Sequence, residues 1–125
     1  MEGLLGYSEV KLGSPQIFKN NSADKLIKLF KLQSDYDLQT AYININGSTA
    51  SFHFGGLLAA SKASNEVNFK AYIYEYNSDI VKFYKDNNAV YVRLSSGALI
   101  MKILGSAQKA EESSVAVSSL TEVKF

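Results

Sequence analysis

The chain has 125 residues, of which 46% are hydrophobic and 20% charged, and its formal net charge is +1. This length predicts one domain whose core can fold without disulfides, and the composition excludes a disordered chain and a collagen-like repeat. The near-neutral charge argues against a polybasic nucleic-acid binder. No apolar run approaches the roughly 18 residues of a transmembrane helix. Neither nucleic acid binding nor membrane insertion is therefore expected.

Cysteine is absent and His53 is the single histidine, which narrows the possible chemistry. Thiol nucleophiles, disulfides and thiolate metal sites are excluded, and a catalytic triad would depend on His53 alone. Asp35 and Asp37, and the turn at residues 86–88, lack the ligand count of a calcium loop. No phosphate-binding loop or metalloprotease motif is present. We therefore expect a non-enzymatic protein without metal or cofactor.

Residues 1–20 are expected to form a lead-in strand or linker, and residues 21–125 a single domain. The first element of that domain, near residues 22–32, fits two structures. Its apolar residues recur at the spacing of a short helix, and they also fit a strand. The strand is favoured because its neighbours in the chain are rich in β-branched and aromatic residues.

Two further strands are predicted at residues 39–46 and 51–54, joined by a turn at Asn46–Gly47, because Asn-Gly is the strongest short hairpin signal. Gly55 and Gly56 are expected to interrupt the second strand, either as a bulge or as a close approach of two backbones. Residues 57–64 fit either a continuation of this strand or a loop.

Residues 66–76 give the clearest strand pattern, because apolar and polar positions alternate. One face carries Val67, Phe69, Ala71, Ile73 and Glu75, and the other carries Lys70, Tyr72, Tyr74 and Tyr76. Residues 80–94 predict a hairpin with a turn at 85–88, where Asp and Asn bond their own backbone. A buried strand at 98–104 follows, then a polar connector at 107–114, and the tail at 113–125 is expected to close a sheet.

Together these segments predict an all-β fold, an antiparallel two-sheet β-sandwich resembling a jelly roll, with seven to nine short strands. The one open alternative is a short helix near residues 22–32.

Tyrosine is the residue type that points to a function. Tyr72, Tyr74 and Tyr76 share one face of a strand, and the next hairpin adds Tyr84, Tyr91 and Arg93. A tyrosine offers a flat apolar ring and a hydroxyl at low entropic cost, which suits a saccharide-binding or protein-binding surface. His53 and Arg93 are candidates for polar contacts to the same ligand. The alternative is that these rings pack in the core or between subunits.

Three segments and one strand of this chain form a recognisable pattern. The segments are the run at 25–29, the strand and turn at 40–47, and the hairpin at 80–92, and the strand that follows ends at Ile103-Leu104. In this pattern residues 26–104 resemble a β-sandwich module that recurs at the C-terminal end of tail fibres, tail spikes and baseplate appendages of tailed bacteriophages.

The resemblance implies a non-enzymatic receptor-binding domain of the virion tail, assembled in the host cytoplasm and acting outside the cell. It implies a homotrimer that binds a host-surface polysaccharide or teichoic acid. Two alternatives remain open. One is a trimerisation or assembly module without a ligand, and the other is a free-standing lectin-like carbohydrate-binding module.

Overall fold

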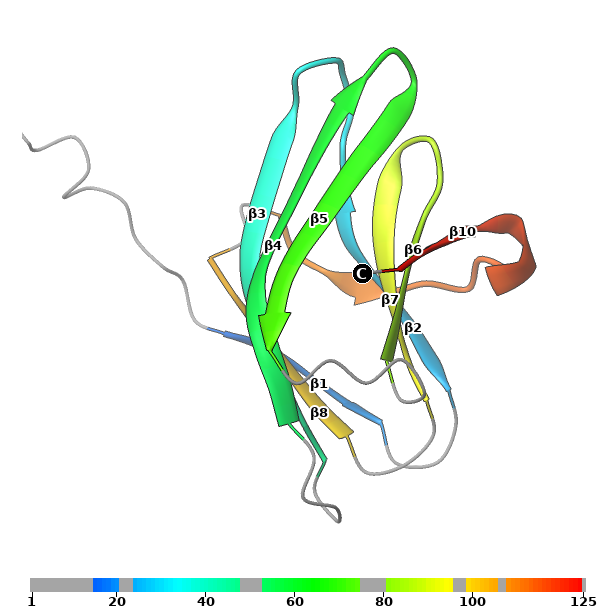
Figure 1. Cartoon of the computed structure of the whole chain (residues 1–125). Helices are drawn as coiled ribbons and strands as arrows, with labels where there is room; N and C mark the ends of the chain where they lie inside the picture. Colours follow the sequence, from blue (N-terminus) through cyan, green and yellow to red (C-terminus); the bar gives the residue numbers. More distant parts are fainter. Residues whose placement is uncertain are drawn as a thin grey trace, which may run out of the picture.

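The computed structural model describes residues 15–20, 24–47, 53–74, 81–95, 99–105 and 108–124. In this part of the chain, ten strands form two antiparallel sheets of five strands each, and the only helical turn is the 3₁₀ turn η1 (Val117–Ser119). Figure 1 shows the two sheets packed as layers. The predicted all-β sandwich is confirmed.

The first sheet, which we call sheet A, contains in spatial order β1 (Gln16–Asn20), β8 (Leu99–Leu104), β3 (Leu38–Gly47), β4 (His53–Ala63) and β5 (Glu66–Tyr74). The second, sheet B, contains β10 (Thr121–Val123), β6 (Val81–Lys85), β7 (Ala89–Leu94), β2 (Lys25–Lys31) and β9 (Glu111–Glu112).

Strand β1 pairs with β8 in sheet A, and β2 pairs with β7 in sheet B. The second pair lies within the first along the chain and belongs to the opposite sheet, as in jelly rolls. In contrast, β3, β4 and β5 stay together as a meander in sheet A. Strand β1 lies within the segment expected to lead into the domain, and all five of its residues pair with β8.

Strand β2 lies where a short helix was the alternative, and over residues 25–31 that alternative is wrong. The helix-like spacing has a structural cause. The register with β7 shifts between Lys28 and Phe30, and such a bulge lets consecutive side chains turn toward the same layer. Leu29 and Phe30 are therefore both buried in the main core.

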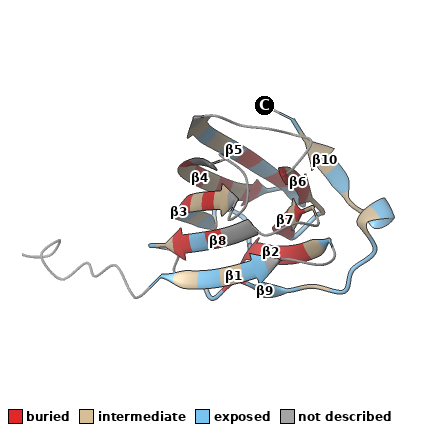
Figure 2. Cartoon of the chain, turned by 90° about the horizontal axis from the view of Figure 1, so that it is seen from below, coloured by how far each residue is buried: buried red, intermediate tan, exposed pale blue. Residues whose placement is uncertain are grey.

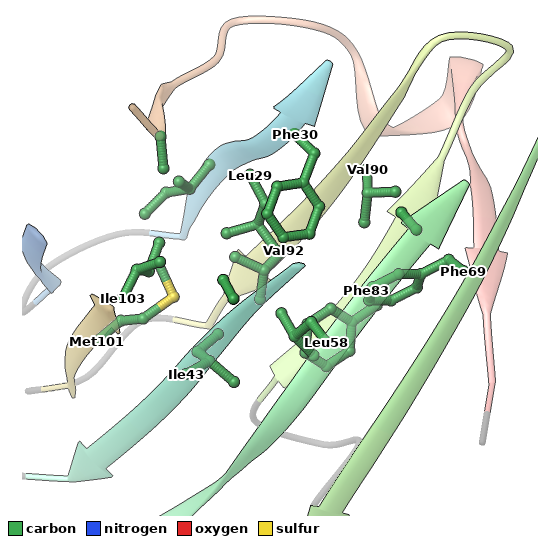
Figure 3. Packing of buried hydrophobic residues seen from close by; sticks show 14 of the residues in the cluster. Leu29, Phe30, Ile43, Leu58, Phe69, Phe83, Val90, Val92, Met101 and Ile103 are labelled. Carbon is green, nitrogen blue, oxygen red and sulfur yellow. The ribbon is translucent and has the colours of Figure 1, made fainter. Parts of the chain in front are cut away.

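The main core lies between the sheets and is formed by buried side chains of β2 to β8, with Phe18 of β1 and Val123 of β10 packed against them (Figure 3). The predicted alternation on β5 is confirmed, since Val67 and Phe69 are buried whereas Lys70 and Tyr72 are exposed. The Phe69 ring of sheet A meets the Phe83 ring of sheet B with centroids 5.5 Å apart. These inward side chains hold the two layers together by apolar burial.

Two tight turns hold the hairpins in register. Between β6 and β7, the Asp86 carboxylate accepts the backbone N–H groups of Asn88 and Ala89, both at 2.8 Å, which confirms the predicted hairpin. Between β4 and β5, Ser64 and Asn65 have φ of 53° and 63°, as a type I′ turn requires. Residues 57–63 therefore continue the strand rather than form a loop.

Gly55 and Gly56 lie inside β4, and of the two predicted roles the close backbone approach is confirmed. A Cβ on Gly56 would lie 1.9 Å from the Tyr72 carbonyl oxygen, and one on Gly55 would lie 2.6 Å from that of Ile43. Strands β3, β4 and β5 reach their observed spacing because these two positions carry no side chain.

Gly56→Ala is expected to destabilise the fold by about 3 kcal/mol, because backbone atoms must move to admit the methyl group. Gly55→Ala is expected to cost less, since its nearest contact is longer. Urea denaturation measures both, with Ser61→Ala on the same strand as the control. Equal midpoints for Gly56→Ala and the control would contradict this role of Gly56.

Candidate functional site

The structure divides the candidate residues between the two sheets. Tyr72 lies on β5 of sheet A, while Tyr84 lies on β6 and Tyr91 and Arg93 on β7 of sheet B. In the backbone, Tyr74 pairs with Gly55 and His53 with Asn46; the side chains of Tyr74 and His53, and the whole of Tyr76, lie outside the described residues.

The tyrosines of sheet B are buried in a second apolar cluster on the outer face of that sheet. Tyr84 is 6% exposed and Tyr91 is 4% exposed, and they pack with Leu26 and Ala89. Val117 and Leu120 of the C-terminal segment cover them, and Figure 2 shows the helical turn η1 on the side of sheet B that faces away from sheet A, next to the edge strand β10. Tyr84 and Tyr91 therefore have the packing role that was the alternative to ligand contact.

Tyr91 is also fixed by a polar contact, because its hydroxyl donates to Asp86 Oδ2 at 3.0 Å. Burial, reinforced by this hydrogen bond and the carboxylate charge, raises the pKa of Tyr91 to about 12. The same carboxylate that closes the β6–β7 turn thus anchors the phenol beneath the C-terminal segment.

Arg93 already has partners within the chain. Its guanidinium pairs with the Asp24 carboxylate, and hydrogen bonding to Tyr84, followed by that to Asp24, raises the pKa of Arg93. Arg93 therefore stabilises one end of sheet B by linking β7 to the start of β2.

The outer face of sheet A instead carries an exposed aromatic row. Tyr42 on β3 pairs with Leu57 on β4, and Leu57 pairs with Tyr72 on β5. Tyr42 is 56% exposed and Tyr72 is 70% exposed. We call Tyr42, Leu57 and Tyr72 the sheet A row. Because adjacent strands are about 4.8 Å apart, the two rings stand about 10 Å apart with the leucine between them.

Amide groups lie directly beside this row. Asn44, two residues along β3 from Tyr42, pairs with Gly55, whose missing Cβ leaves space for the Asn44 amide. Asn46 Nδ2 donates to Asn44 Oδ1. The face therefore offers flat apolar rings next to hydrogen-bonding amides.

Sequence reasoning missed Tyr42, although one signal for it was present. Its strand was predicted, and in an alternating strand Tyr42 must face away from Ala41 and Ile43, which are both buried. The sequence did not show that Tyr42 aligns with Tyr72, because that alignment depends on the register of three strands.

The acidic residues considered as calcium ligands instead bond to backbone N–H groups. Asp37 Oδ2 accepts from the Gln33 N–H at 3.0 Å, and Asp35 Oδ1 accepts from the Ser64 N–H at 2.9 Å. Across the described ranges, no group of three or more His, Cys, Asp or Glu residues is placed to hold a metal ion.

Comparisons with protein-family models, with curated proteins and with solved structures give no match for this chain. In the part of the chain that the structure describes, no helix has the length and apolar character needed to span a bilayer.

Tyr91→Phe removes the hydroxyl that Asp86 accepts and is expected to destabilise the fold by about 1.5 kcal/mol at pH 8. The stabilisation by this hydroxyl is fully present below pH 10, the unperturbed pKa of tyrosine, and is lost as the pH rises through the folded-state pKa of about 12. The difference in free energy of unfolding between wild type and variant should therefore narrow above pH 10, by at most about 1.4 kcal/mol per pH unit. Urea denaturation of both proteins from pH 8 to pH 11 measures this gap, and a gap independent of pH would contradict the assignment.

Proposed function

We propose that the chain is a non-enzymatic glycan-binding domain that engages a polysaccharide through the outer face of sheet A. The observation that carries the proposal is the sheet A row, in which two largely exposed tyrosines flank Leu57 in register across three strands. Exposed aromatic rings of this kind are enriched at binding surfaces.

The chemistry of the face suits a sugar polymer. The C–H side of a pyranose ring packs on the flat apolar face of a phenol, while sugar hydroxyls need hydrogen-bond partners. The hydroxyls of Tyr42 and Tyr72 and the amide of Asn44 are on the same face. A row of side chains across a sheet, rather than one enclosed cavity, favours an extended chain over a small ligand.

The biological setting of the proposal comes from the sequence resemblance. Since residues 26–104 resemble modules of tailed-phage appendages, we propose that the domain belongs to a virion tail and contacts a host-surface glycan outside the cell. A homotrimer is part of this proposal. A chain without cysteine is compatible with assembly in a reducing cytoplasm.

A second candidate function is subunit assembly. The observation that favours it is that the outer face of sheet A also exposes Ile17 on β1 and Leu38 on β3, each by more than half. Large exposed apolar side chains are typical of protein interfaces.

Light scattering over a dilution series tests assembly. A stable mass of three times 13.7 kDa indicates a trimer, and a mass of 13.7 kDa favours a free-standing lectin-like module.

Tyr42→Ala and Tyr72→Ala are each expected to lower the affinity for glycan by about tenfold, because each removes an exposed ring at the centre of the proposed face. The fold should persist, since neither side chain belongs to the buried core. An array of bacterial surface polysaccharides identifies the ligand, and calorimetry then measures its affinity for each variant.

Tyr36→Ala is the matched control, because Tyr36 is 92% exposed but lies in the turn between β2 and β3. Its affinity should equal that of the wild type. The proposal is wrong if no polysaccharide on the array binds, or if Tyr36→Ala weakens binding as much as the two variants in the row.

A further inference from the structure

The described residues on the outer face of sheet A carry an excess of positive charge. Lys19 on β1, Lys70 on β5 and Lys102 on β8 are all exposed there, at positions that alternate with inward-facing residues. The only described carboxylate on the face is Glu66, the first residue of β5. Glu66 lies four residues from Lys70, a separation of about 13 Å along a strand.

The other described carboxylates lie elsewhere. Those of sheet B and its approach are Asp24, Glu111, Glu112 and Glu122. Two of them are paired, Asp24 with Arg93, and Glu112 with Lys25 at 3.3 Å. Asp35, Asp37 and Asp86 accept hydrogen bonds from backbone N–H groups in turns. Sheet B has cations of its own, which are Lys25, Lys28, Lys31, Lys82, Lys85 and Arg93, beside its four carboxylates. The outer face of sheet A differs in that its three described lysines share it with one described carboxylate.

Two of the lysines stand at the two ends of the sheet A row. Lys70 is two residues from Tyr72 on β5, a separation of about 7 Å along the strand. At the other end, Leu104 pairs with Tyr42, and Lys102 pairs with Asn44. In the described part of the chain, neither the Lys70 nor the Lys102 ammonium forms an ion pair or a hydrogen bond. The register places Lys70 level with Ala59 and Lys102 level with Asn44, so the two lysines flank the row on opposite sides, one near each end.

We infer that the ligand of this face is an acidic glycan, a polymer of sugar rings that carry carboxylates. The inference rests on the proposed glycan-binding function and names its ligand class. The rings pack on Tyr42 and Tyr72, and the carboxylates interact with Lys70 and Lys102. A polyanion without sugar rings, such as poly(glycerol phosphate), satisfies the lysines but leaves the tyrosines without a partner.

The direction of the ligand follows from the same positions. From β8 to β5 there are three strand spacings, about 14 Å, and the register offsets Lys70 from Lys102 by four residues along the strands, about 13 Å. The two lysines therefore lie about 20 Å apart on a diagonal of the face. A glycan that contacts both runs obliquely across the strands, and its affinity should stop rising with chain length once it spans this distance.

The test uses pairs of polymers that differ only in charge. Polygalacturonate and hyaluronan are the acidic probes, their methyl esters are the neutral partners, and poly(glycerol phosphate) is the probe without sugar rings. Wild type should bind an acidic polymer at least about fivefold more tightly than its ester, and rising ionic strength should weaken only the acidic complex.

Lys70→Gln and Lys102→Gln should each lower the affinity for the acidic polymer by about three- to fivefold. Lys31→Gln, an exposed lysine of sheet B, is the matched control and should change nothing.

The outcomes separate this inference from the proposed function. Equal affinity for a polymer and its ester, lost in Tyr72→Ala, would overturn the acidic ligand class and retain glycan binding. Acidic binding that Tyr72→Ala does not weaken, or equally tight binding of poly(glycerol phosphate), would show attraction by charge alone and overturn both. Failure of both acidic polymers to bind, with neutral polysaccharides binding on the array, would also overturn the acidic ligand class.

Discussion

The C-terminal segment packs Val117 and Leu120 onto Leu26, Tyr84 and Tyr91, and this contact separates the buried tyrosines of sheet B from the exposed tyrosines of sheet A. It buries Tyr84 and Tyr91 on the outer face of sheet B, so that part of the sheet is covered on both sides within the chain. Sheet A is covered on its inner face, while Tyr42 and Tyr72 on its outer face remain more than half exposed. The stabilising free energy of apolar burial is roughly proportional to the apolar area removed from water. The segment therefore stabilises the fold where it covers tyrosines, and the tyrosines that it does not cover form the surface for which we propose a ligand.

The sequence was sufficient for the features that depend on local chemistry. Alternation on β5 placed Val67 and Phe69 inside and Tyr72 outside, because side chains on a strand point to opposite faces in turn. The hairpin of β6 and β7 was found through its Asp-Asn turn, whose capping by Asp86 involves only neighbouring residues. By contrast, the helix-like spacing in β2 arises from a bulge against β7, a partner about sixty residues away along the chain.

The candidate site was harder to predict because it depends on contacts between distant segments. Tyr72 and Tyr91 have the same alternating pattern in the sequence, and alternation separates two faces without showing which outer face a later segment covers. Tyr91 is buried by residues more than twenty positions further along, and nothing local to Tyr91 indicates this. The alignment of Tyr42 with Tyr72 through Leu57 needs the register of β3, β4 and β5, which depends on the Ser64-Asn65 turn and the close approach at Gly56.

The central claim is that the outer face of sheet A binds glycan while that of sheet B serves the fold. The most direct measurement is an NMR titration, in which an oligosaccharide of the polymer that binds is added to the ¹⁵N-labelled chain and the amide chemical shifts are monitored. The account predicts shift changes centred on Tyr42, Leu57 and Tyr72, with the amides of η1 and of Tyr91 unchanged. Changes centred on η1 and β7 with none on β3 to β5 would contradict it.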